Sequence, residues 1–231
     1  RTTMKKQLIT LFALVMFASS TAYAGQFGVG ASGSLAIVEG AGTESDQDGT
    51  ADTSHRDATA SNNAFIGSVF GEYTFESMGG MTFGIDYIPG SADVNSKNLK
   101  QTNVDGAVDT DADASTKTVN AEVSDVITYY AELPLHGGLY FKAGMTTMDI
   151  TTNEKDTNAN GSTYGNTDAD GVVLGLGYRN SFGTGGGFYK LEGTHTEFDT
   201  ITLKDNITDK GNQIKADLDV TRVTFAVGYN F

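Results

Sequence analysis

The sequence predicts an all-β protein: an eight-stranded, antiparallel, up-and-down transmembrane β-barrel preceded by a cleavable signal peptide. Three observations lead to this prediction: an apolar segment near the start, eight runs of alternating apolar and polar residues, and a regular alternation of short and long links between those runs. Alternation with period two is the pattern of strands with one apolar face, and unequal links at the two ends are typical of membrane barrels.

The composition excludes several other classes of protein. A length of 231 residues suits one all-β barrel or two small domains. The absence of Cys excludes a disulfide framework, a thiolate metal site and a cysteine nucleophile. Asp and Glu total 29 against 15 Lys and Arg, which gives a net charge of −14. This charge argues against a nucleic-acid partner, because binding to phosphates requires a basic surface.

The first 24 residues have the parts of a secretory signal peptide. A short basic segment precedes an apolar core at residues 8–18, and small residues stand where a signal peptidase cleaves, after Ala24. The apolar core is too short to cross a bilayer, which takes about 20 residues. We therefore expect residues 1–24 to comprise a signal peptide with upstream residues and residues 25–231 to form the barrel.

Eight runs of the remaining chain place apolar residues at alternate positions. They span residues 27–37, 65–75, 81–87, 127–133, 139–145, 172–178, 189–191 and 223–231. The links predicted to be short turns are 76–80, 134–138 and 181–186, and those predicted to be long polar loops are 40–62, 90–118, 150–170 and 200–216. Because an even number of strands returns the chain to its starting side, both termini are expected at the end with short turns, which is the periplasmic end in a bacterial barrel.

If the apolar face meets lipid, the other face lines the barrel interior. That face carries four acids and four bases, which we predict to form ion pairs: Glu72, Asp86, Glu132, Lys142, Arg179, Lys190, Glu192 and Arg222. An eight-stranded barrel is only wide enough for its own side chains to fill it, and charges in such an interior need partners. The alternative is a set of solvated charges on the polar face of a soluble sheet.

The last residues carry the most specific motif. The chain ends at Phe231, with Phe225 and Tyr229 at alternate upstream positions. This ending resembles the C-terminal signature of Gram-negative outer-membrane proteins, and residues 25–231 resemble the eight-stranded OmpA/OmpX/OmpW-type family. The resemblance implies a bacterial outer-membrane location with extracellular long loops. It also implies contact with outer-membrane lipid and lipopolysaccharide, and recognition of the last strand by the barrel-assembly machinery. No peptidoglycan-binding domain follows, so we expect a barrel alone.

Acidic residues spaced by two in the expected loops suggest divalent-cation binding. Asp109, Asp111 and Asp113 form one such set, and Asp168 and Asp170 belong to another. Both resemble the start of a calcium loop but lack the glutamate that completes its register. These residues remain candidates for a loose Ca²⁺ or Mg²⁺ site, and the alternative is that they keep the loops hydrated. No cofactor is expected.

Three functions remain open at this point. The first is a structural or surface-interaction role with acidic extracellular loops, whose external partner the sequence does not name. The second is a narrow passive channel for small or apolar solutes, which a lateral opening in the barrel wall would favour. The third is a lipid-modifying enzyme, but His195 has Thr196 rather than a serine beside it, so no catalytic residues are assigned.

Overall fold

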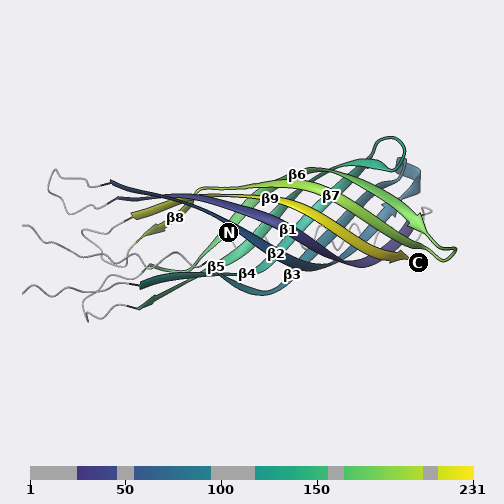
Figure 1. The fold of residues 1–231 in the computed structure, drawn as a ribbon. Helices are drawn as coiled ribbons and strands as arrows, with labels where there is room; N and C mark the ends of the chain where they lie inside the picture. Colours follow the sequence, from purple (N-terminus) through teal and green to yellow (C-terminus); the bar gives the residue numbers. More distant parts are fainter. Residues whose placement is uncertain (1–24, 46–54, 95–117, 156–163, 205–212) are drawn as a thin grey trace, which may run out of the picture.

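The protein is a closed antiparallel β-barrel. The computed structural model describes residues 25–45, 55–94, 118–155, 164–204 and 213–231 (Figure 1). The strands are β1 (Gly25–Ser45), β2 (His55–Phe75), β3 (Met81–Val94), β4 (Thr118–Pro134), β5 (Leu139–Lys155), β6 (Thr167–Phe182), β7 (Gly187–Phe198), β8 (Ile201–Lys204) and β9 (Gln213–Asn230). Each pairs with its neighbours in an antiparallel sense, and β1 pairs with β9 to close the sheet.

The nine strands make an eight-stranded barrel because β8 continues the line of β7 along the same partner, β9. Glu197 of β7 lies opposite Asp219, whereas Ile201 of β8 lies opposite Ala216, so one extra residue is inserted between the two segments. This break follows the strand with the shortest alternating run in the sequence, residues 189–191. The prediction of an all-β, eight-stranded, antiparallel barrel is confirmed.

The three short turns lie together at one end, on the right of Figure 1 beside the C-terminus. The first contains a single 3₁₀ turn, Glu76–Met78, followed by Gly79 and Gly80 at φ values of 70° and 89°. Backbone of this kind favours glycine, which explains why a glycine pair stands at this tight reversal. No helix in the described part of the chain is long and apolar enough to cross a membrane.

The predicted long loops were too long, because the strands continue into them. β1 and β2 remain paired as far as Ser45 and His55, although residues 40–62 were predicted to be a loop. The apolar alternation ends near Ile37 because only the membrane requires an apolar outer face. Backbone pairing does not depend on that requirement, and polar residues such as Thr continue a strand in water. The same correction applies to the other three long links, 90–118, 150–170 and 200–216.

The outer face carries an apolar belt at the end with short turns. On β1 the outward residues run from Phe27 to Ile37, and on the paired part of β2 from Phe75 to Phe65. Each of these stretches is eleven residues long, close to the 9–11 residues that a tilted strand needs to cross a bilayer. Aromatic contacts at the rim include Phe27 with Phe231, at 6.4 Å between ring centroids.

Ala31 and Ala41 offer a direct test of this belt. Both are exposed on the outer face of β1, but Ala31 lies in the middle of the belt and Ala41 beyond it. We expect Ala31→Arg to destabilise the barrel by about 2–4 kcal/mol and Ala41→Arg by about 0–1 kcal/mol, because only the first places a charge in hydrocarbon. Urea titration in lipid vesicles measures both. Equal costs for the two variants would show that the belt does not face lipid.

Candidate functional site

The interior at the short-turn end is occupied by a network of buried charges around Lys190. The ammonium group of Lys190 lies 2.8 Å from Glu72 Oε2, 2.8 Å from Glu132 Oε1 and 3.7 Å from Glu192 Oε1. Its side chain is only 2% exposed. One cation therefore holds together three acids that come from β2, β4 and β7.

Two more cations neutralise this cluster. Lys142 lies 2.8 Å from Glu192 Oε2, and Arg179 pairs with Glu72. Tyr140 and Tyr130 donate hydrogen bonds to Glu192 (2.5 Å) and Glu72 (3.0 Å). The three acids thus face three bases and two phenol donors, which is the arrangement that buried charges require. We call Glu72, Glu132, Lys142, Arg179, Lys190 and Glu192 the charge network.

Aromatic rings complete the filling of this half of the barrel. Phe188 is fully buried against Phe70, with ring centroids 6.2 Å apart. The guanidinium group of Arg179 lies 3.8 Å from the centroid of Phe188, and the ammonium of Lys190 lies 4.5 Å from that of Phe70. The two rings therefore pack directly against the charge network and add cation–π attraction to the ion pairs.

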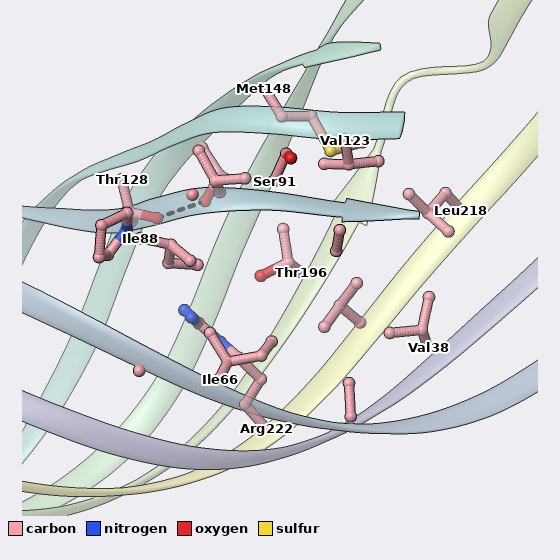
Figure 2. Close-up of a pocket in the computed structure, with 18 of the residues that line it drawn as sticks. Val38, Ile66, Ile88, Ser91, Val123, Thr128, Met148, Thr196, Leu218 and Arg222 are labelled. Atoms are coloured by element: carbon pink, nitrogen blue, oxygen red, sulfur yellow. Dashed lines mark hydrogen bonds between the residues drawn. The ribbon is translucent and has the colours of Figure 1, made fainter. Parts of the chain in front are cut away.

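The other half of the interior contains an apolar cavity of about 340 Å³ (Figure 2). Its apolar lining includes Val38, Ile66, Ile88, Val123, Val126, Met148, Phe198, Leu218 and Val220. The inward face of β4 shows how the two halves join: Thr128 lines the cavity, and toward the short turn it is followed by Tyr130 and Glu132. On β7, Thr196 lines the cavity and is followed toward the short turn by Thr194, Glu192 and Lys190. The cavity therefore ends where the charge network begins.

The barrel wall beside this cavity is incomplete. β2 and β3 pair only from Val69–Tyr87 to Phe75–Met81. Farther from the short turns, β2 still pairs with β1, and β3 still pairs with β4. No pairing joins β2 to β3 there in the residues that the structure describes. In Figure 1 the purple and blue ends of β1 and β2 lie apart from the teal ends of β4 and β5. We call this gap in the ladder, with residues 64–67 on one side and 88–92 on the other, the lateral opening.

Local sequence explains why β3 leaves β2 at this position. Pro89 has no N–H group to donate to a ladder, and Gly90 has a φ of 91°. Between Ile88 and Ser91 the pairing with β4 shifts by one residue, so β3 carries a bulge that bends it. A second bulge follows on β4 between Ser124 and Ile127. Both bulges lie beside the cavity.

The lateral opening begins at the edge of the apolar belt that faces the long loops. Phe65 stands at its edge on β2 with 77% of its surface exposed, and its partner on β1, Leu35, is 68% exposed. Ala64, Ile66 and Gly67 of β2 line the cavity itself. Apolar outer surface and apolar interior therefore meet at this gap, and the unpaired strand edges line a cavity, which is where a membrane barrel tolerates them.

Comparison with known proteins assigns the chain to a family. The family model described as "Outer membrane protein beta-barrel domain" matches residues 10–231. The chain belongs to this family. The resemblance to outer-membrane barrels is therefore confirmed, and the family indicates the bacterial outer membrane as the location of this barrel. No curated protein matches the chain.

Several solved structures are similar to this outer-membrane barrel. OprG from Pseudomonas aeruginosa has 14% identity and a TM-score of 0.44, with 90% of this chain and 97% of that chain covered. Neisserial surface protein A has 10% identity and a TM-score of 0.35, with 85% and 97% covered. Ail of Yersinia pestis, solved with the heparin analogue sucrose octasulfate, has 10% identity and a TM-score of 0.34, with 86% and 99% covered.

The structure brings six of the eight predicted lumen charges into the charge network but leaves Asp86 and Arg222 out of any ion pair in the described residues. Asp86 accepts a 2.5 Å hydrogen bond from Ser68 instead. Arg222 lines the apolar cavity. The ion pairing of these two stays a prediction, because strand parity gives the direction of a side chain but not its height in the barrel.

The apolar cavity was not predicted, although the sequence carries a signal for it. Val38, Ile66, Met148, Leu218 and Val220 stand at positions with inward parity, where polar residues were expected. Reading the inward face of each strand beyond the apolar belt would have shown this cluster. Val126 shares the inward parity of Thr128, but the contribution of Val123 could not be seen in this way, because the bulge on β4 changes the parity beyond it.

The remaining candidate residues that the structure describes do not assemble into a site. Asp109, Asp111 and Asp113 lie outside the described residues, as do residues 1–24. Within the described ranges no group of three or more His, Asp or Glu is placed to hold a metal ion, and this includes Asp168 and Asp170. His195 is exposed on β7, where its Nδ1 lies 3.0 Å from the hydroxyl of Thr221.

Lys190 tests the charge network. We expect Lys190→Met to destabilise the barrel by about 3–5 kcal/mol, because Glu72 and Glu132 then lose their common cation. Adding Glu132→Gln should restore part of this loss by removing one stranded charge. Lys204→Met, at an exposed position on β8, should change stability by less than about 0.5 kcal/mol. Urea titration in vesicles measures all three, and a lack of any rescue by Glu132→Gln would contradict the network.

Proposed function

We propose that this outer-membrane barrel is a passive conduit for small apolar solutes. A solute enters the cavity from the end with long loops, which we place outside the cell, and leaves sideways through the lateral opening into the bilayer. The observation that carries this proposal is the joining of an apolar cavity to a gap in the strand ladder at the loop-side edge of the apolar belt.

The energetics of this route are favourable for apolar molecules. A lipopolysaccharide surface is a hydrated, charged layer that an apolar solute enters poorly. The cavity offers a surface of Val, Ile, Leu, Met and Phe side chains, and each Å² of apolar solute surface removed from water contributes about 25 cal/mol. Because Ala64, Ile66 and Ile88 continue this apolar surface to the opening, a solute would stay in contact with apolar side chains on its way to the lipid.

The filled half of the interior supports lateral rather than straight passage. Charges and rings from β2, β4, β5, β6 and β7 close the barrel below the cavity. A solute in the cavity would have to displace ion pairs to continue along the barrel axis, and breaking such pairs is costly. Sideways exit requires no ion pair to break.

The alternative functions have less support in the described residues. The structural or surface-interaction role depends on acidic loops that lie largely outside them, so it stays a prediction, as does recognition of Phe225, Tyr229 and Phe231 by the assembly machinery. A lipid-modifying enzyme would require His195 to meet a serine or acid, whereas its ring contacts Thr221. We therefore assign no catalytic residues.

Narrowing the lateral opening should reduce the passage of apolar solutes. Ala64→Phe and Ala92→Phe add rings on the two sides of the gap, and Ala143→Phe adds the same ring on the outer face of β5, away from it. We expect the first two to lower naphthalene entry into vesicles with a lipopolysaccharide outer leaflet to the level of vesicles without protein. The third should leave entry unchanged. Equal entry for all variants, measured by naphthalene fluorescence, would contradict the conduit.

The wild-type barrel should carry no steady ion current. The charge network and the rings of Phe70 and Phe188 occupy the interior at the short-turn end, and we expect them to block a continuous aqueous path. Current across planar lipid bilayers is the measurement, with insertion verified by naphthalene entry in vesicles from the same preparation. A stable conductance in barrels that also admit naphthalene would show that the interior is open along its axis.

A further inference from the structure

Arg222 is the one cationic side chain that lines the apolar cavity in the described residues. It lies on the inward face of β9, half-buried, between Ala36 of β1 and Thr194 of β7 in the strand register. Figure 2 shows its guanidinium group reaching from β9 into the cavity, on the side where Ile66 lies. None of its register neighbours carries a negative charge.

The acids of the interior are engaged elsewhere. Glu72, Glu132 and Glu192 are each within 2.8 Å or less of a lysine or arginine of the charge network. Asp86 accepts a hydrogen bond from Ser68, and no ion pair joins it to Arg222 in the described residues. The charge network is neutral as a set. Of the two predicted interior charges outside it, Arg222 lines the apolar cavity, whereas Asp86 does not.

A half-buried cation without a partner is costly for a protein unless something compensates it. A guanidinium group presents a planar fork of donors that matches a carboxylate, and such charge-assisted pairs are among the stronger hydrogen bonds. Four hydroxyl residues, Ser91, Thr128, Thr146 and Thr196, line the same cavity and offer further polar contacts. The cavity thus has a few polar groups within a mostly apolar wall, as in many ligand pockets.

We propose that the cavity binds solutes that join one carboxylate to a single hydrocarbon chain, with the carboxylate on Arg222 and the chain along Ile66 and Ile88 toward the lateral opening. This proposal rests on the conduit function and names its preferred solute class, a free fatty acid of medium chain length. The volume of about 340 Å³ lies at the lower end of small-molecule pockets and is too small for a lipid with two or more chains.

The test compares three single-chain probes on the barrel in lipid nanodiscs: decanoate, decanol and decyltrimethylammonium. Equilibrium dialysis with radiolabelled probe at mildly alkaline pH measures binding, with empty nanodiscs as the baseline. We expect saturable decanoate binding that is about tenfold or more tighter than that of decanol, since one charge-assisted hydrogen bond is at stake. The cationic probe should bind more weakly than decanol.

Substitutions at Arg222 then separate charge from cavity shape. Arg222→Gln should lower decanoate affinity to that of decanol and leave decanol unchanged, and Arg222→Lys should lie between. Lys215→Gln, at an exposed position on the same strand, should change neither affinity. Folding of each variant is verified by its heat-modifiable band. If Arg222→Gln does not fold, two measurements still test the carboxylate site: the affinity of Arg222→Lys for decanoate and the order of the three probes on the wild type.

The outcomes distinguish this inference from the conduit function. If decanol binds as tightly as decanoate, or if Arg222→Gln leaves decanoate binding unchanged, the carboxylate site is wrong while the apolar conduit stands. If no probe binds above the empty nanodiscs and naphthalene entry is insensitive to Ala64→Phe, the conduit itself is wrong. Decanoate binding that depends on Arg222 together with naphthalene entry that depends on the opening supports both.

Discussion

The structure depends on the requirement that backbone N–H and C=O groups in lipid find hydrogen-bond partners within the protein. A closed ladder of strands meets it, and the pairing of β1 with β9 provides the closure. The pairing between β2 and β3 does not meet this requirement, because it stops at Val69 and Tyr87 while both strands continue. The edges that it leaves unpaired line a cavity rather than bare lipid, and this is why the proposed function is placed there.

The two halves of the interior differ in what fills them. At the short-turn end, three acids and three bases neutralise each other around Lys190, which closes the barrel at the cost of desolvating six charges. At the other end, Val, Ile, Leu, Met and Phe side chains leave a cavity that needs no charge compensation except at Arg222. In the proposed route, an apolar solute would leave the cavity through the lateral opening without reaching the ion pairs, because the cavity ends where the charge network begins.

Several features of this barrel follow from residues that are close in the sequence. Alternation from Phe27 to Ile37 and from Phe65 to Phe75 predicts both strands and which of their faces is apolar. Parity then assigns Glu72, Lys142 and Glu192 to the interior without any knowledge of their partners. Pro89 is a further local signal, since a proline in a strand points to an edge or a bulge, and its meaning was not used in the prediction.

The sequence by itself determined the fold class, the direction of the side chains on regular strands and the apolar belt, because these depend on a period of two along one strand. Only the tertiary structure decided that Asp86 and Arg222 stay out of the charge network and that β3 separates from β2. It also decided that apolar residues of β1 to β5, β7 and β9 line one cavity. These outcomes depend on the height at which side chains from different strands meet. That height is set by register, bulges and the closure of the whole barrel, and no single strand contains this information.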